Sequence, residues 1–164
     1  MSIKQEDNEN QFLTFYVSDD LYALSVHNIK EILEYSVITK VPMIHKSISG
    51  ITNIRGSVIP VVDLGVRLDI KDEQSLNKRT SVIVIEKEDA NGDKFLIGLL
   101  VDEVNEVYDI LAKSQEDTPA FGNKIRKEFV EHIAKVKGKF IPILNTSTLI
   151  NIEELSQVDD TKEM

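Results

Sequence analysis

Residues 51–63 read ITNIRGSVIPVVD, and residues 133–145 read IAKVKGKFIPILN. The two stretches align without a gap, with Ile, Gly, Ile and Pro identical at matching positions. Arg is matched by Lys, Asp by Asn, and the other hydrophobic residues of the first stretch by hydrophobic residues. An internal echo of this kind indicates a molecule built from two copies of one small unit.

A predicted hairpin precedes each of these stretches. Residues 12–26 hold two β-rich runs around the turn SDD, and residues 81–101 hold two around DANGD. A short segment then follows each hairpin, VHNIKEI at 26–32 and VDEVNEV at 101–107. The first fits a short helix or a bent strand and is too brief to decide. In the second, Asp102 is expected to cap a turn of helix.

Glycine and proline punctuate the repeated motif. Gly56 and Gly138 interrupt two apolar runs, which predicts a turn with positive φ or a bulge. Pro60 and Pro142 fall inside the second run, where a missing N–H is tolerated at an edge, a strand start or a bulge. Many short strands with sharp corners are typical of small barrels. The sequence therefore predicts an all-β fold with minor α content.

The length allows one domain of two small halves. We expect a single domain over 11–152, made of barrel 1 (about 11–68) and barrel 2 (about 80–152), with strands that can be shared. Halves of this size would be marginal alone, so they should pack together. Residues 66–80 are expected to form a polar connector. A further strand is expected at 37–41, and a short closing helix within 147–155.

Charge and composition restrict the partners. The net charge is -9, and acidic residues gather in 1–10 and 153–164, which we expect to be flexible termini. An acidic chain is a poor partner for nucleic acid. There is no cysteine, so disulfides and thiolate metal sites are excluded. The start MSIKQE has no apolar signal core, and no apolar run would insert into a membrane, so we expect a cytoplasmic protein.

Residues for catalysis are scarce. The histidines His27, His45 and His132 lack metal-ligand spacing, and no nucleophile elbow, Walker loop or dinucleotide fingerprint occurs. Asp63 and its counterpart Asn145 are better placed to cap the turn that follows each motif. We therefore expect no catalytic residue, no metal and no cofactor. A small β-barrel enzyme using Asp63 or His45 is the remaining alternative.

An acid and a cation recur in the two copies. Arg55 stands beside the turn glycine and Glu31 lies in the short segment before it, while the second copy has Lys137 and Glu106. We hypothesise that the acid and the cation approach one another in each barrel. The ordinary alternative is two surface charges, with an exposed pair worth about 0–1 kcal/mol. An arginine favours a planar, bidentate contact with a partner.

Four motifs together resemble the CheW-type chemotaxis adaptor (coupling protein) family. They are YAL-x-V-x-x-I-x-EI at 22–32, IT-x-VP at 38–42, GI-x-NIRG-x-x-IPVVDL at 50–64 and G-x-x-VD-x-V-x-EV at 98–107. The resemblance implies two SH3-like five-stranded β-barrels packed around a hydrophobic seam. It also implies a non-enzymatic scaffold, recruited to membrane-associated receptor arrays, that joins methyl-accepting chemotaxis receptors to the regulatory domain of the histidine kinase CheA.

The resemblance also implies roles for individual residues. Glu31 and Arg55 would belong to the coupling surface. Two further sets of residues would contact the partners. The groove for a receptor helix would involve Ile29, Gly50, Val82 and Val107. The kinase-docking end of barrel 1 would involve Tyr35, Val37, Ile38 and Ile44. For these aliphatic residues, plain barrel core is an equally open alternative.

The chain departs from the family pattern in two loops. Gly65 replaces an arginine that often follows Asp-Leu, with Arg67 two residues on, and a second proline after Pro42 is absent. A CheV-type coupling domain is a further alternative, although that protein would need a receiver domain for which we expect no room here. The first copy is expected to carry the coupling contact, and the second to be its structural partner.

Overall fold

The computed structural model describes residues 10–34, 38–40, 45–70, 80–116 and 125–151. The strands are β1 (Gln11–Val17), β2 (Asp20–Ser25), β3 (Ile29–Glu34), β4 (Ile48–Ile54), β5 (Ser57–Asp63), β6 (Ser81–Glu88), β7 (Lys94–Val101), β8 (Glu103–Asp109), β9 (Gln115–Glu116), β10 (Val130–Val136) and β11 (Lys139–Leu144). The helices are the 3-10 turns η1 (Val26–Asn28), η2 (Ala112–Ser114) and η3 (Lys127–Phe129) and the α-helices α1 (Leu64–Arg67) and α2 (Thr146–Leu149).

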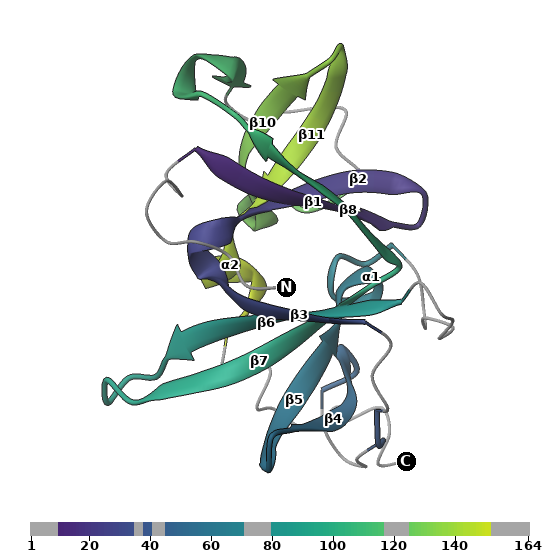
Figure 1. The fold of residues 1–164 in the computed structure, drawn as a ribbon, viewed down its shortest axis with the longest axis vertical. Coiled ribbons are helices and arrows are strands. Elements are labelled where there is room, and N and C mark those ends of the chain that lie inside the picture. Colours follow the sequence, from purple (N-terminus) through teal and green to yellow (C-terminus); the bar gives the residue numbers. More distant parts are fainter. Residues whose placement is uncertain (1–9, 35–37, 41–44, 71–79, 117–124, 152–164) are drawn as a thin grey trace.

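These elements form two sheets stacked one above the other (Figure 1). One sheet has the order β8-β1-β2-β11-β10-β9 and the other the order β3-β6-β7-β5-β4. The predicted all-β class with two SH3-like barrels is confirmed, and the first sheet adds only the two-residue strand β9 to five longer strands. Within the described part of the chain, none of the helices has the length and apolar character needed to cross a membrane.

The repeated motif forms the same tight hairpin twice. At the β4–β5 turn Arg55 and Gly56 have φ of 52° and 85°, and at the β10–β11 turn Lys137 and Gly138 have φ of 50° and 79°. Two consecutive left-handed residues give a turn whose twist matches that of the flanking strands. Glycine adopts this conformation without the steric cost that a Cβ brings. The predicted positive φ at both glycines is confirmed.

The prolines lie where their strands have a single neighbour. Pro60 is opposite Ile51 of β4, and Ile51 directs its own N–H and C=O to Thr39 on the other side. Pro60 is therefore in a non-hydrogen-bonded pair, and β5 joins β7 only from Val61 onward. Pro142 likewise precedes the single point at which β11 meets β2. The missing N–H thus removes no ladder bond at Pro60.

Each sheet takes strands from both copies of the repeat. The third strand of each copy crosses to the hairpin of the other, since β3 pairs with β6 and β8 pairs with β1. The expected bounds, about 11–68 and 80–152, thus separate the two copies of the repeat, and the strand sharing that we allowed for takes place through β3 and β8. The repeat reveals two similar units, but pairing between them leaves no local sequence pattern.

The short segments after the hairpins are mainly extended. η1 gives one tight turn, and β3 follows as a bent strand with a register shift between Ile29 and Glu31. The predicted helical turn after Asp102 is wrong, because β8 begins at Glu103. Asp102 instead accepts a hydrogen bond from the Ser18 N–H at 2.6 Å. This carboxylate satisfies the β1–β2 turn rather than a helix end.

The two α-helices lie between the sheets (Figure 1). Asp63 caps α1 by accepting from the Val66 N–H at 3.3 Å, and Asn145 caps α2 by accepting from the Ser147 N–H at 2.9 Å. Both predicted caps are confirmed. The predicted polar connector is wrong at its start, since all of α1 is buried, including Arg67. The closing helix begins at Thr146, one residue before the predicted range.

A single large core joins the sheets. It contains side chains from both, among them Phe15, Leu24, Ile83, Leu99 and Phe129. Each sheet also has one smaller cluster of its own, around Ile141 in the first sheet and around Val84 in the second. Of the predicted strand 37–41, the described residues include an isolated bridge between Thr39 and Ile51. The predicted flexible termini lie outside the described residues, apart from Asn10.

Candidate functional site

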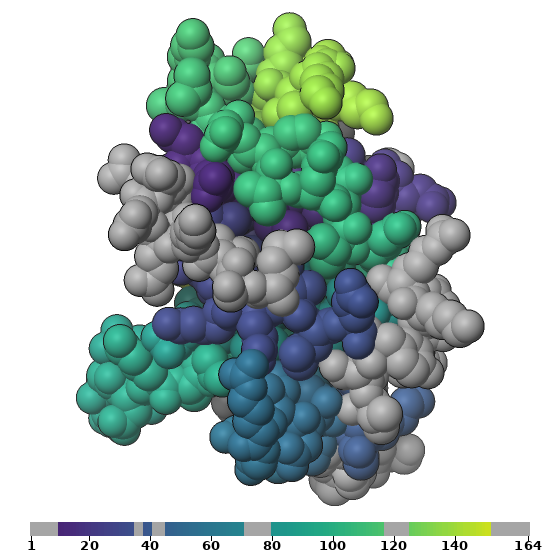
Figure 2. Space-filling view, in the orientation of Figure 1, coloured from purple at the N-terminus to yellow at the C-terminus, as the bar shows by residue number. Residues whose placement is uncertain are grey.

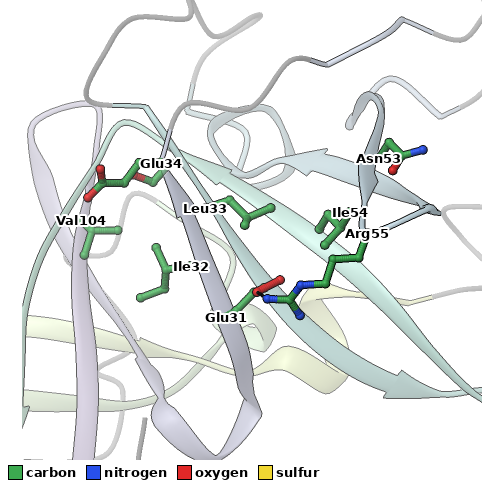
Figure 3. A pocket seen from close by; sticks show the side chains of 9 residues that line it. Glu31, Ile32, Leu33, Glu34, Asn53, Ile54, Arg55 and Val104 are labelled. Carbon is green, nitrogen blue, oxygen red and sulfur yellow. Dashed lines mark hydrogen bonds and ion pairs between the residues drawn. The ribbon is translucent and has the colours of Figure 1, made fainter. Parts of the chain in front are cut away.

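An ion pair joins Glu31 and Arg55 in the first copy. The Arg55 Nη2 lies 2.9 Å from the Glu31 Oε2, and Figure 3 shows the two side chains pointing toward one another. β3 supplies Glu31, and the left-handed turn after β4 supplies Arg55. The Arg55 side chain is 82% exposed, while Glu31 is only 18% exposed. The predicted approach of acid and cation is confirmed in this copy.

A groove of about 600 Å³ adjoins this pair. Its wall is partly apolar, with Ile32, Leu33 and Ile54 from one sheet and Val104 of β8 from the other (Figure 3). Polar groups of Glu34, Asn53 and Ser81 complete it. Because Val104 belongs to the other sheet, the groove lies where the two barrels meet. An apolar wall beside a displayed guanidinium can receive an amphipathic segment.

Sequence reasoning missed the residues of this wall. In the sequence, Ile32, Leu33 and Ile54 look like any strand residues. In the structure Ile32 and Leu33 are half-buried, whereas Ile54 is only 9% exposed and belongs mainly to a core cluster. Two of these residues could have been found from their neighbours in the sequence, because Ile54 precedes Arg55 and Ile32 follows Glu31. Val104 had no such signal, since its approach to the groove depends on the crossing of β8 to the other copy's hairpin.

The other residues expected at the groove do not line it. Ile29 and Val82 are buried in the core, which favours the alternative that they are plain barrel-core residues. Gly50 is buried beneath Thr39, whose carbonyl oxygen would lie 2.2 Å from an added Cβ. Val107, 38% exposed on β8, is the member of this set that offers a surface. A role for these four residues in partner binding stays a prediction.

The residues expected at the kinase-docking end are mostly outside the described part of the chain. This holds for Tyr35, Val37 and Ile44. Ile38 is described and packs, half-buried, against the cluster that includes Ile54 and Ile59. The assignment of this end to a kinase therefore stays a prediction.

The second copy replaces the ion pair with a tyrosine-centred contact. In the described residues Glu106 and Lys137 form no direct ion pair. The Tyr108 hydroxyl donates to the Glu106 carboxylate, and the Lys137 Nζ lies 5.5 Å from the centre of the Tyr108 ring. The hydrogen bond to Glu106 raises the pKa of Tyr108 above its ordinary value. Both charged side chains thus lie against Tyr108, which sequence reasoning missed, and the described residues show no copy of the Glu31–Arg55 ion pair here.

The alternative of an enzyme finds no support in the geometry around its two named residues. Asp63 is engaged as the cap of α1, and the His45 Nδ1 accepts from the Ser47 N–H at 3.1 Å. Among the described residues, no cluster of three or more histidine, cysteine or acidic side chains is arranged to hold a metal ion.

Comparison with known proteins decides the family. The model of the CheW-like domain matches residues 11–154. The chain belongs to the CheW-like family. It is 34% identical over 143 residues to "Chemotaxis protein CheW" of Thermotoga maritima and 29% identical over 143 residues to that of Bacillus subtilis. Each alignment covers 87% of this chain and 88% of the relative.

A solved structure shares the fold. The crystal structure of scaffolding protein TtCheW from Thermoanaerobacter tengcongensis superposes with a TM-score of 0.77 at 33% identity. The match covers 90% of this chain and 97% of that chain. As a CheW-like protein, the chain is a chemotaxis scaffold or adaptor and not an enzyme.

Proposed function

We propose that this CheW-like protein couples methyl-accepting chemotaxis receptors to the histidine kinase CheA, in the cytoplasm at membrane-associated receptor arrays, and so controls kinase activity. The observation that carries the proposal is the Glu31–Arg55 pair at the rim of a partly apolar groove between the barrels. The family membership and the solved relative, which is a scaffolding protein, support it.

The groove has the properties that an amphipathic helix requires. Helix-in-groove recognition uses a few apolar anchors at helical spacing, which the half-buried Ile32 and Leu33 can receive. Arg55 keeps several N–H donors beyond the one that meets Glu31, so its guanidinium can also hold a carboxylate of the receptor. Glu31 would hold the guanidinium in position for that contact.

The ion pair contributes little to folding. Arg55 is largely exposed, and exposed pairs are worth about 0–1 kcal/mol. Arg55 also has a left-handed backbone, which is unfavourable for a side-chain-bearing residue. The hairpin turn accounts for this conformation, which Lys137 repeats, so it is the exposed guanidinium that is better explained by binding than by stability.

The kinase would dock at the end of barrel 1 that includes Ile38, with Tyr35, Val37 and Ile44 as further contacts. Separate surfaces for receptor and kinase would let one small protein link both. Several weak links of this kind hold an array together through multivalency.

Arg55→Glu is expected to abolish coupling while leaving the fold intact. The substitution places a carboxylate beside Glu31, in a groove that Glu34 also lines, so the rim becomes repulsive to an acidic receptor segment. We expect at least a tenfold loss of affinity for the receptor fragment, or about 1.4 kcal/mol of binding free energy, and with it the loss of receptor-dependent kinase activation. The measurement is co-sedimentation with a receptor cytoplasmic fragment and CheA, read together with kinase activity.

Lys94→Glu provides the matched control. Lys94 is also an exposed cation paired with a glutamate, Glu86, but it lies on the β6–β7 hairpin away from the groove. Coupling should survive this change. If Arg55→Glu melted normally and coupled normally, the site would be wrong, although family membership would stand.

A further inference from the structure

The tip of the β10–β11 hairpin is strongly basic. Residues 135–140 read KVKGKF, and all three lysines are exposed. Phe140, which follows them, is 61% exposed. A cluster of cations around an exposed aromatic side chain is unusual on a chain whose net charge is -9.

The first copy of the repeat shows that the turn does not require these residues. The matching segment at 53–58 reads NIRGSV, in which a single cation, Arg55, is neutralised by Glu31. The backbone is nonetheless the same, with φ of 52° and 85° in one turn and 50° and 79° in the other. The turn requires its glycine but not the three lysines or the phenylalanine. These four residues of the second copy therefore need an explanation other than the turn geometry.

The lysine charges are not neutralised within the fold. Among the described residues, Lys135, Lys137 and Lys139 form no ion pair. The Lys135 Nζ lies 5.9 Å from the centre of the Phe140 ring, and the Lys137 Nζ lies 5.5 Å from that of Tyr108. Cation–π contacts attract an ammonium group without cancelling its charge. The tip therefore keeps a positive field and an exposed ring side by side.

This tip is remote from the groove. The β4–β5 hairpin that carries Arg55 stands at one end of the molecule, and the yellow-green β10–β11 hairpin stands at the opposite end (Figure 2). The two surfaces can therefore be occupied independently.

We propose that residues 135–140 form a docking surface for an acidic segment of a partner protein that also carries an apolar side chain. Carboxylates of the segment would meet Lys135, Lys137 and Lys139, and the apolar side chain would cover Phe140. A short segment can contact the tip alone. A nucleic acid or an anionic bilayer would also face the acidic remainder of the chain, which repels it.

The test uses a synthetic peptide of repeated Glu-Glu-Phe-Glu-Glu-Leu, with affinity measured by fluorescence anisotropy and the contact mapped by amide NMR. The triple variant Lys135→Glu, Lys137→Glu and Lys139→Glu is expected to lose at least about tenfold in affinity. The matched control reverses Lys46, Lys94 and Lys127, which are also exposed, lie outside the β10–β11 hairpin and change the net charge by the same amount. It should lose no more than about twofold, through long-range charge alone.

A second pair of variants tests the apolar contact without changing charge. Phe140→Ser should weaken peptide binding several-fold, whereas Val58→Ser, at the matching exposed position of the first copy, should not. The Arg55→Glu protein should bind the peptide normally while it loses receptor coupling. A failure of the docking proposal and a failure of the proposed coupling function are therefore distinguishable.

Three results would overturn the proposal. One is no binding of the peptide to the unaltered protein, with amide shifts absent from 135–140. Another is an equal loss in both triple variants, which would reduce the effect to net charge. The last is tighter binding to a DNA duplex or to phosphatidylglycerol vesicles than to the peptide.

Discussion

Replacing Gly50 with alanine is expected to lower the free energy of unfolding by about 2–4 kcal/mol. An added Cβ would lie 2.2 Å from the Thr39 carbonyl oxygen and 2.9 Å from the Ile38 Cγ2. The first neighbour is backbone, so it cannot turn aside as a flexible side chain would. Thr39 and Ile51 exchange two hydrogen bonds of 2.8 Å, and the clash would break this bridge.

Chemical denaturation measures the loss, and Gly56→Ala is its control. A Cβ on Gly56 would meet no atom within 4 Å, but its φ of 85° makes alanine strained. That strain alone costs about 1–2 kcal/mol. Amide exchange at Thr39 and Ile51 should accelerate in the Gly50 variant and not in the Gly56 variant. Equal losses in the two proteins would show that the close approach does not determine the need for glycine at position 50.

A Gly50 variant would disturb more than one predicted surface. Gly50 was expected at a receptor groove, but its backbone supports Ile38 and Thr39, next to the residues expected to meet the kinase. A loss of coupling on substitution would therefore follow from displacement of this segment. It would not by itself identify Gly50 as a contact residue.

The features that the sequence predicted correctly are local ones. The hairpins follow from alternation and turn residues, and the positive φ of Gly56 and Gly138 follows from their place between two apolar runs. The caps Asp63 and Asn145 follow from their position at a strand end. Even the Glu31–Arg55 pair was accessible, because the repeat carries an acid and a cation at fixed places in both copies.

The features that were missed depend on contacts between distant segments. Shared strands were expected, but no local signature shows that β3 and β8 are the strands exchanged, and this exchange brings Val104 to the groove. Tyr108 separates Glu106 from Lys137 because the second copy has a tyrosine where the first has Leu33. The second copy thus keeps a cation, Lys137, at the position of Arg55, but this cation contacts the Tyr108 ring and not a glutamate.

Arg67 is the clearest case of a misleading local pattern. It begins a polar run, yet it is only 4% exposed in the structure. Its Nε donates to the Leu149 carbonyl at 2.6 Å, its Nη2 donates to the Thr148 carbonyl at 3.2 Å, and its guanidinium lies 4.8 Å from the centre of the Phe129 ring. Arg67 thus links α1 at the end of the first copy to α2 at the end of the second.

Arg67→Ala is therefore expected to cost about 3 kcal/mol of unfolding free energy, because it leaves buried carbonyls without donors and opens a cavity beside Phe129. Arg67→Lys should recover part of this loss. An ammonium group can reach one carbonyl, but it lacks the planar fork that serves two acceptors while stacking on a ring. Thermal and urea unfolding of the three proteins measure the order.

Arg126→Ala is the control that separates stacking from hydrogen bonding. Arg126 lies 4.5 Å from the centre of the same Phe129 ring, but its side chain is 55% exposed. Exposed cation–π contacts are worth about 0.5–1 kcal/mol, so this variant should lose no more than that. If both alanine variants lost the same amount, the stacking on Phe129 would account for the whole effect. The hydrogen bonds from Arg67 to the Leu149 and Thr148 carbonyls would then not stabilise the packing of α1 against α2. The burial of the Arg67 charge would need another explanation.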